Sequence, residues 1–284
     1  MKFDLIVQGA VLLASDIVAL CAIAGASGEG RVDVTSTAWR LSDAQPASRN
    51  AVAAYCADHA IDFAFVPSEQ RWSDVGLIAM DMDSTLITIE CIDEIADHVG
   101  KKAEVAEVTE CAMRGEIDWP QSLRQRVALL AGLDETALAE VYELRLKLTP
   151  GAEELIAFAK SCGIKLLLVS GGFTYFTERL KMRLGLDYAF SNTLEIIDGK
   201  LTGRVTGDLC DARAKARHLV EVRDALGLAH HQTLAIGDGA NDLPMMAEAG
   251  FSVAFHAKPK VQAEAASAIN FGGLERVVTL FQPS

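Results

Sequence analysis

The stretch GLIAMDMDST, residues 76–85, places a short apolar run directly before two aspartates and a serine-threonine pair. A second stretch with the same plan, TLAIGDGAND, occupies residues 233–242. Short apolar runs bounded by glycines and polar residues are typical of buried parallel strands, and ligands bind at the carboxyl ends of such strands. We therefore expect both acidic motifs to lie at one edge of a parallel sheet and to form a single metal site.

The chain around the second motif alternates between helical and strand patterns. We expect helices over 152–161, 173–184, 212–226, 243–249 and 259–266, and strands over 165–169, 188–191, 233–236 and 252–255. A hairpin is expected over 193–205, where Asp198 and Gly199 can supply the positive φ angles of a tight turn. This alternation predicts an α/β fold whose core is a doubly wound, Rossmann-like parallel sheet.

Two regions depart from the alternation. Residues 90–148 are helical in pattern almost throughout, which predicts a helical cap inserted at about 89–149 into a core domain spanning 75–284. Residues 1–74 predict a separate small α+β domain, and its polar residues 67–74 predict a linker. Its expected strands are 3–8, 32–38 and 61–66, and its expected helices are 12–24 and 48–59.

Composition and charge exclude several classes of partner. The chain has 284 residues, half of them hydrophobic, and a formal net charge of -13, which opposes binding to nucleic acid or to an anionic membrane. Gln8 and Asp16 interrupt the apolar segment 5–26, so it fits neither a secretory signal nor a membrane span. The six cysteines form no C-x-x-C pair, and we expect ordinary core residues of a cytoplasmic protein.

Asp81 and Asp83 are the candidate catalytic residues. A carboxylate can attack a phosphoryl group and form an aspartyl-phosphate, and Asp81 stands at the expected strand end. A second carboxyl group two residues later can protonate the leaving oxygen and then activate water. This requires a turn after Asp81 that brings Asp83 to the same phosphate, and the expected passage from strand to loop allows it.

Other residues can neutralise the charge of a phosphoryl group. Mg2+ held by Asp81, Asp238 and a backbone carbonyl would neutralise much of it. Ser170, Gly171 and Gly172 follow the apolar run 166–169 and can offer a hydroxyl and closely approaching N–H groups. Lys215 can add a positive charge.

These residues, in this order, resemble the haloacid dehalogenase-like phosphohydrolase superfamily: DMDST at 81–85, a strand-end Ser170, then Lys215, then GDGAND at 237–242. The helical insertion is similar to the cap of the phosphoserine phosphatase family through Glu90, AMRG at 112–115, Trp119 and QSLRQRV at 121–127. The resemblance runs from about Val75 to near the C-terminus. The first 74 residues suggest only an ACT-like regulatory or dimerisation module.

The resemblance implies a Mg2+-dependent phosphatase that hydrolyses O-phospho-L-serine through an aspartyl-phosphate, the last step of L-serine biosynthesis. It implies Asp81 as nucleophile and Asp83 as general acid and base. It implies Asp81, Asp83 through its backbone carbonyl, and Asp238 as metal ligands. The implied substrate ligands are Glu90 for the amino group, Arg126 for the carboxylate, and Ser170, Gly171, Lys215 and Asn241 for the phosphate. Trp119 stands where the resemblance leads us to expect a smaller aromatic residue, so the resemblance does not predict how the cap closes.

Each motif alone has a simpler interpretation. A calcium-binding loop at 81–92 is opposed by Leu86, which stands where such a loop needs glycine. Ser170-Gly-Gly alone is more often a simple turn, and Lys215 alone fits a solvated basic helix face. Spacing does not single out Glu90 and Arg126 from the charged residues around them, so their roles depend on the resemblance.

Two rival functions remain open at this point. One is a phosphatase or phosphotransferase for another small phosphomonoester, and the other is a non-catalytic phosphoacceptor or amino-acid sensor. A sensor has no need for an acid and base such as Asp83 beside its phosphoacceptor. The sequence does not decide whether residues 1–74 bind serine, or whether the protein is a homodimer.

Overall fold

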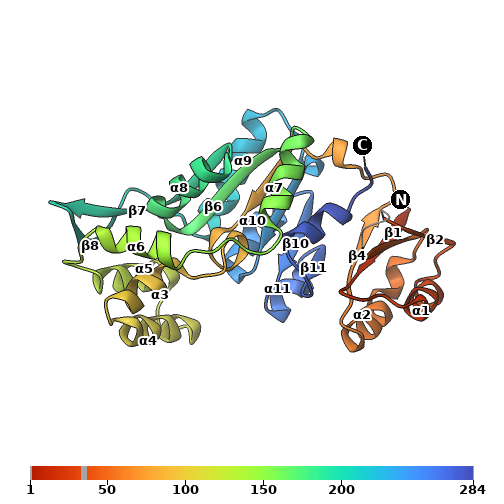
Figure 1. Ribbon diagram of the computed structural model, residues 1–284, viewed down its shortest axis with the longest axis horizontal. Helices are drawn as coiled ribbons and strands as arrows, with labels where there is room; N and C mark the ends of the chain where they lie inside the picture. The colour runs from red at the N-terminus through yellow and green to blue at the C-terminus, as the bar shows by residue number, and fades with distance from the viewer. Residues whose placement is uncertain (1, 33–36, 284) are drawn as a thin grey trace.

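The structure is a computed structural model that describes residues 2–32 and 37–283. Within these residues the strands form one sheet of eleven strands in the order β2-β3-β1-β4-β11-β10-β9-β5-β6-β7-β8. Figure 1 shows the N-terminal strands and helices at one end of the molecule and the remaining elements at the other. No helix in the described part of the chain is long and apolar enough to cross a membrane.

The core of the molecule is the parallel part of this sheet. It contains β11 (Ser267–Ile269), β10 (Phe251–Phe255), β9 (Thr233–Gly237), β5 (Leu77–Met80), β6 (Lys165–Phe173) and β7 (Tyr188–Ile197), and β8 (Lys200–Thr206) is antiparallel to β7. The expected α/β class is confirmed. The short strand β11 was not predicted, and β6 and β7 extend beyond their expected ends because β6 continues through Gly171 and Gly172 and β7 runs into the hairpin.

Helices cover both faces of the core sheet. α7 (Ala152–Ser161) and α8 (Thr174–Leu184) pack on one face, and α9 (Ala212–Ala225), α10 (Leu243–Ala247) and α11 (Pro259–Glu264) pack on the other. Side chains alternate along β5, so Ile78 and Met80 join the first layer and Leu77 and Ala79 join the second. Burial on both faces explains why this strand is a continuous apolar run.

The region predicted to be a helical cap is helical in the described residues, with α3 (Cys91–His98), α4 (Lys102–Met113), α5 (Trp119–Ala128) and α6 (Thr136–Leu144). The chain segments that enter and leave the cap pair at Ile87 and Leu148. At the far end, Leu201 of the β7–β8 hairpin accepts a backbone hydrogen bond from Gly132 and donates one to Leu133, each 2.8 Å long. The cap is therefore attached to the core at two places.

The N-terminal region is a four-stranded antiparallel sheet with two helices. Its elements are β1 (Phe3–Gln8), α1 (Ala14–Ala24), β2 (Gly28–Arg31), β3 (Ala38–Ser42), α2 (Arg49–Asp58) and β4 (Asp62–Pro67). The strand expected over 32–38 falls largely on residues 33–36, which lie outside the described residues. Strand β2 ends before that segment, and strand β3 begins after it.

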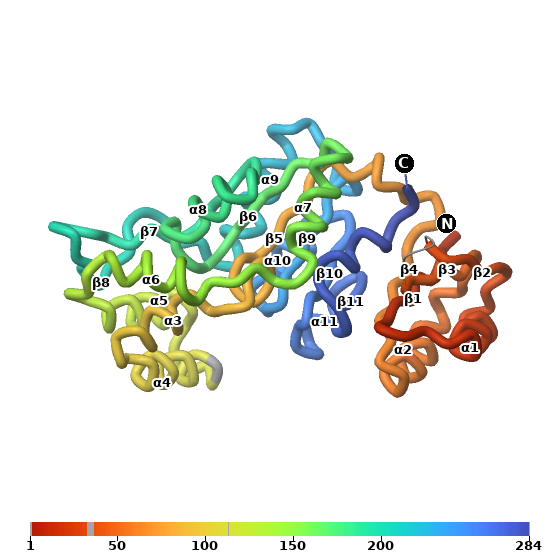
Figure 2. Tube along the Cα trace, in the orientation of Figure 1, coloured from red at the N-terminus to blue at the C-terminus, as the bar shows by residue number. Residues whose placement is uncertain are grey.

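The expected linker at 67–74 is packed against the rest of the molecule. Trp72 is buried, and its indole N–H donates to the backbone carbonyl of Val278 at 2.8 Å. Asp62 of β4 accepts hydrogen bonds of 2.8 Å from the backbone N–H groups of Asn270 and Phe271. Figure 2 shows the last part of the chain running beside the N-terminal region. The polar sequence 67–74 therefore does not make a free tether, and the domain division at residue 74 stays a prediction.

Candidate active site

Asp81 is positioned by two parallel strands. It follows β5, and its N–H donates to the carbonyl of Ile236 in β9 at 3.0 Å. Its carboxylate oxygen Oδ1 accepts a hydrogen bond of 2.7 Å from the N–H of Met82. Ser84, with a φ of 56°, then turns the chain. The expected turn is therefore present, and both Asp81 and Asp83 line one cavity.

Asp83 and Glu90 are held near each other by this turn. Oδ1 of Asp83 accepts from the N–H of Cys91 at 3.2 Å, and the hydroxyl of Ser84 donates to Glu90 Oε1 at 2.7 Å. Burial, and then the charge of Glu90, raise the pKa of Asp83 to about 7. At neutral pH a substantial fraction of Asp83 is therefore protonated, as a group that gives a proton to a leaving oxygen requires.

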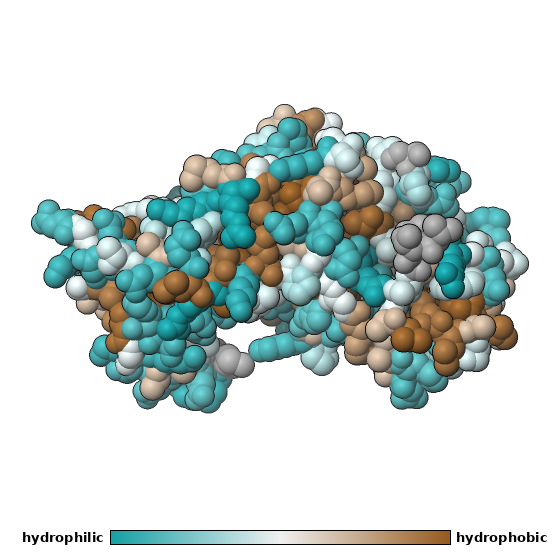
Figure 3. Space-filling model, in the orientation of Figure 1, coloured by the Kyte–Doolittle hydropathy of each residue, from teal (hydrophilic) through white to brown (hydrophobic). Residues whose placement is uncertain are grey.

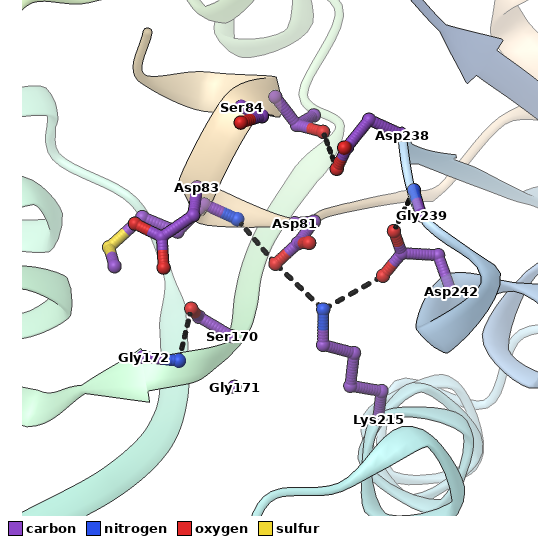
Figure 4. A network of polar contacts seen from close by, with 12 residues as sticks. Asp81, Asp83, Ser84, Ser170, Gly171, Gly172, Lys215, Asp238, Gly239 and Asp242 are labelled. Carbon is purple, nitrogen blue, oxygen red and sulfur yellow. Dashed lines mark hydrogen bonds and ion pairs between the residues drawn. The ribbon is translucent and has the colours of Figure 1, made fainter. Parts of the chain in front are cut away.

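A buried lysine connects the two acidic motifs. Lys215 on α9 is 1% exposed, and its Nζ lies 2.7 Å from Oδ1 of Asp81 and 2.8 Å from Oδ1 of Asp242. Figure 4 shows this ammonium group between the two carboxylates. Burial lowers the pKa of Lys215, but the two carboxylates outweigh burial and raise it, so the lysine stays charged. A pair of carboxylates sharing one cation leaves the cluster negative.

Asp238 adds a third carboxylate to the cluster. It follows β9, and the hydroxyl of Thr85 donates to its Oδ1 at 3.4 Å. One carboxylate oxygen each from Asp81, Asp238 and Asp242 lie within 4.8 Å of one another. Burial, and then Asp242, raise the pKa of Asp238 to about 6. Carboxylates that repel one another in a buried place fit a divalent cation with a preference for oxygen ligands.

Asp242 is a residue of this cluster that the sequence did not identify as functional. Its Oδ1 accepts from Lys215, and its Oδ2 accepts from the N–H of Gly239 at 3.0 Å. A Cβ atom at Gly237 would collide with its carboxylate, so the motif needs glycine there. Both oxygens of Asp242 already have protein partners, which leaves Asp81 and Asp238 as the more open metal ligands. The second motif contained the signal, because Asp242 stands only four residues after Asp238.

Ser170, Gly171 and Gly172 form the opposite wall of the site at the end of β6. The hydroxyl of Ser170 accepts from the N–H of Gly172 at 2.8 Å, and Ser170 is fully buried. A Cβ at Gly172 would lie 2.9 Å from Oδ2 of Asp83, and a Cβ at Gly171 would lie 3.0 Å from the ring of Trp119. Both glycines therefore allow close approach by a neighbouring part of the site.

Asn192 supports this wall and was missed in the sequence. It lies on β7, is 1% exposed, and its amide nitrogen donates to the carbonyls of Gly171 at 2.7 Å and Gly172 at 3.3 Å. Its amide oxygen accepts from the N–H of Cys210 at 2.9 Å. No pattern in the sequence singles out Asn192, because an asparagine after a strand is usually a turn residue.

The cap supplies Glu90 and Arg126. Arg126 lies on α5, where its Nε donates to the carbonyl of Ser122 at 3.4 Å, and no carboxylate in the described residues lies within 4.0 Å of its guanidinium. Burial lowers the pKa of Arg126, while Asp93 and Glu90 act in the opposite direction. Burial also raises the pKa of Glu90. A charged arginine without an ion-pair partner is available to bind a carboxylate.

A cavity of about 590 Å³ joins these groups. Every predicted site residue lines it except Lys215, which lies behind Asp81 and touches its carboxylate. The predicted residues that line it are Asp81, Asp83, Glu90, Arg126, Ser170, Gly171, Asp238 and Asn241. The core contributes several carboxylates and backbone N–H donors, and the cap contributes the carboxylate of Glu90 and the guanidinium of Arg126.

Comparison with known sequences identifies the class of this fold and site. The family model described as haloacid dehalogenase-like hydrolase matches residues 78–247, and the chain belongs to that family. A phosphoserine phosphatase from Albidiferax ferrireducens is 58% identical over 218 residues, which cover 75% of this chain and 92% of that protein. A second model, described as a domain of unknown function, matches residues 5–52.

Solved structures extend the likeness to the whole chain. A haloacid dehalogenase family hydrolase from Salmonella enterica serovar Typhi is 32% identical with a TM-score of 0.91, covering 99% of this chain and 98% of that one. The unliganded structure of a probable phosphoserine phosphatase from Vibrio cholerae is 42% identical with a TM-score of 0.83, covering 98% of this chain and 86% of that one. The N-terminal region is therefore part of an arrangement found elsewhere in the family.

Proposed function

We propose that the protein is a Mg2+-dependent phosphatase that hydrolyses O-phospho-L-serine to L-serine and phosphate. The observation that carries this proposal is one cavity with the Asp81 carboxylate beside a buried lysine at its base and an arginine without an ion-pair partner in the described residues at its cap. The high identity to phosphoserine phosphatases over three quarters of the chain supports the same substrate. The reaction is the last step of L-serine biosynthesis.

Asp81 is the proposed nucleophile. Its Oδ1 is occupied by the N–H of Met82 and by Lys215, which leaves Oδ2 to attack phosphorus. The bond from phosphorus to the serine oxygen then breaks, and an aspartyl-phosphate remains on Asp81. Ser170, the N–H of Gly171, Lys215 and Asn241 are the proposed phosphate ligands.

Asp83 is the proposed acid and base. With a pKa of about 7 it can hold the proton that the departing serine oxygen needs. Once ionised, the same carboxylate can take a proton from the water that attacks the aspartyl-phosphate. The metal ligands we propose are Asp81, the backbone carbonyl of Asp83, and Asp238; bound Mg2+ neutralises charge on the phosphoryl oxygens.

Glu90 and Arg126 are the proposed determinants of substrate choice. A substrate ammonium pairs with a carboxylate, and a substrate carboxylate pairs with the planar fork of arginine. Phosphoserine carries both groups, whereas sugar phosphates carry neither. Trp119 lies over Gly171 at the contact between cap and core, where it can exclude water from the reacting phosphate.

A substrate panel tests the proposal. Phosphate release is measured from O-phospho-L-serine, phosphohomoserine and several sugar phosphates, each with Mg2+ and with excess chelator. We expect preference for phosphoserine and loss of activity on chelation. Equal kcat/KM across the panel would favour a general phosphomonoesterase, and one phosphorylation of Asp81 without repeated phosphate release would favour a phosphoacceptor.

The organisation of the chain is a further part of the proposal. We assign residues 1–74 to an ACT-like regulatory or dimerisation domain and residues 75–284 to the phosphatase domain, with the cap inserted at about 89–149. The β-α-β-β-α-β order of the N-terminal elements supports the first assignment. We also place the enzyme in the cytoplasm, because its six cysteines are all free.

A homodimer is the assembly we propose to test. Val11, Leu13 and Val18, in and before α1, are exposed large apolar side chains, and Figure 3 shows an apolar area at the N-terminal end of the molecule. Exposed apolar patches are typical of interfaces. Sedimentation of the protein beside a Leu13→Asp/Val18→Asp variant tests this, and a wild-type monomer would overturn it.

A further inference from the structure

Strand β6 is irregular where it reaches the active site. It pairs in parallel with β7 at Val169 and Phe190 and again at Phe173 and Asn192. Three residues of β6 therefore face a single residue of β7 between these two pairs. Such a bulge interrupts the hydrogen bonds between strands and leaves backbone groups to be satisfied in another way.

The side chain of Asn192 replaces the missing strand partner. Its Nδ2 donates to the carbonyl oxygens of Gly171 and Gly172, which lie in the bulge. These two residues are glycines, which have the widest choice of backbone conformations and so need the most external restraint. The buried amide thus fixes the orientation of the peptide between them.

Fixing a carbonyl also fixes the N–H group of the same peptide. In a trans peptide the C=O of Gly171 and the N–H of Gly172 point in opposite directions. The carbonyl points to Asn192, and the N–H points to Ser170 Oγ at 2.8 Å, on the side of Asp83 and the cavity. Figure 4 shows this N–H and the Ser170 hydroxyl facing Asp83.

The other end of the same amide reaches the segment that leads to Lys215. Asn192 Oδ1 accepts from the N–H of Cys210, and α9 begins two residues later. Asp211 caps that helix by accepting from the N–H of Ala214 at 2.8 Å. One side chain therefore connects the glycine wall and the helix that carries the lysine.

We propose that Asn192 is a positioning residue that sets the peptide orientation of the glycine wall and its distance from Lys215 for phosphate binding. The inference rests on the proposed function, since it assigns Asn192 to the phosphate subsite of that reaction. Asn192 does not touch the substrate itself. It acts through Ser170, Gly171 and Lys215.

The test compares Asn192→Asp and Asn192→Ser with the wild-type enzyme. Aspartate keeps the shape of the side chain but cannot donate to the two carbonyls, and serine keeps only a short polar group. Because misplacing preorganised phosphate donors affects the transition state most, we expect kcat to fall about tenfold to a hundredfold. We also expect inhibition by inorganic phosphate to weaken, while KM for phosphoserine changes less, since Glu90 and Arg126 are unaffected.

Asn270→Ala is the matched control. Asn270 is also held in a side-chain network, with Asp62 and Gln262, but it lies outside the cavity. The control should lower Tm with kcat and phosphate inhibition unchanged. Asn192 variants with wild-type kcat and phosphate inhibition, or a control that reproduces their kinetic losses, would overturn the proposal.

Calorimetric titration with inorganic phosphate separates this proposal from the proposed function. Weaker phosphate binding by both Asn192 variants supports the positioning role even if phosphoserine proves to be the wrong substrate. Unchanged phosphate binding overturns it, whatever the wild-type enzyme hydrolyses.

Discussion

The core half and the cap half of the active site differ in how their charged groups are held. In the core, Lys215 is fully buried and contacts two carboxylates within 2.8 Å. In the cap, Arg126 has no carboxylate within ion-pair distance in the described residues, and Glu90 is held by the hydroxyl of Ser84. The core cation Lys215 is paired before any ligand arrives, whereas the cap cation Arg126 is left for a ligand to pair. The negative charge that remains in the core carboxylate cluster is left for a metal ion.

From this difference we infer that the core carries out the chemical step and that the cap selects the substrate. In this proposal the preorganised core acts on any phosphomonoester that reaches it, because its groups surround the proposed nucleophile, Asp81. Glu90 and Arg126 form no salt bridge among the described residues, so they add no salt-bridge energy to the stability of the fold. Their charges match only a substrate with an ammonium and a carboxylate. Substitutions in the core should therefore reduce the chemical step or the fold, and substitutions in the cap should reduce substrate binding.

Removing the proposed nucleophile, Asp81, should give the largest effect. Asp81→Asn keeps the size of the side chain but removes the attacking oxygen, so we expect kcat for phosphoserine to fall by about ten-thousandfold or more. Lys215 retains Asp242, so Tm should change little. Phosphate release and a thermal melt measure both quantities, and kcat within tenfold of wild type would remove Asp81 from the mechanism.

Removing the buried lysine should affect the fold as well as the reaction. Lys215→Met leaves Asp81 and Asp242 buried without their shared cation, and breaking a buried pair in this way costs about 3 to 5 kcal/mol. Urea denaturation at neutral pH should show a loss of this order. Lys181→Met, on α8 and partly exposed, is the control and should cost far less. Equal losses would mean that the core network is not specially stabilising.

Removing the cap arginine should raise KM rather than lower kcat. Arg126→Ala leaves the substrate carboxylate unpaired, and we expect KM for phosphoserine to rise about tenfold to a hundredfold. Arg124→Ala, two residues away on the same helix and exposed, is the matched control. KM for a phosphomonoester without a carboxylate should be unchanged in both variants. An unchanged KM for phosphoserine in Arg126→Ala would show that the cap does not select the substrate in this way.

The same division governs what could be predicted from the sequence. Asp81 and Asp238 were identifiable because each follows a buried apolar strand, and parallel strands bring their carboxyl ends together. Glu90 and Arg126 were not identifiable from spacing, because cap helices carry many charged residues and their packing is set by tertiary contacts. Their choice depended on resemblance to a family.

The residues and elements that the sequence did not predict were missed for physical reasons. Asn192 acts through contacts between segments distant in sequence, such as the bulge of β6, which no local pattern reports. Asp242 lies within the second motif, but its contact with Lys215 joins two distant segments. The strand β2 is the sequence GEGR, whose residues have low strand propensity, so only its pairing with β3 makes it a strand. The packed segment at Trp72 was read as a linker from its polar neighbours.

Metal binding should depend on pH through the core carboxylates. The pKa values of Asp83, about 7, and Asp238, about 6, lie above their ordinary value of 3.8, so the folded metal-free protein binds protons more tightly than the unfolded chain. These two groups therefore reduce metal-free stability as pH rises from about 4 to 7. In the proposed metal site Mg2+ would bind the ionised carboxylate of Asp238 and so offset that group's part of the loss.

Thermal melts with and without Mg2+ measure this effect. The rise in Tm caused by Mg2+ should be small at pH 5 and several degrees larger at pH 8. Asp238→Asn should abolish the rise at both pH values. A rise in Tm that is equal at pH 5 and pH 8 in the wild-type protein would contradict the assignment of the metal to the carboxylate of Asp238.

The smallest effect is expected at the lip of the cavity opposite the cap. Lys258 and Lys260 line the cavity from the core side, are exposed, and have no ion-pair partner among the described residues. Figure 3 shows hydrophilic residues at the opening between α11 and the α4 end of the cap. The chain has a net charge of -13, and two such cations would attract an anionic substrate to the opening of the cavity.

Neutralising both lysines should therefore slow capture of the substrate without changing the chemical step. Lys258→Gln/Lys260→Gln should lower kcat/KM about threefold at low ionic strength, with kcat unchanged, and the difference should shrink as salt screens the charges. Lys147→Gln/Arg183→Gln removes the same charge from exposed positions outside the cavity and should have little effect. A loss that persists at high salt would instead place these lysines in direct contact with the substrate, and the core would then share selection with the cap.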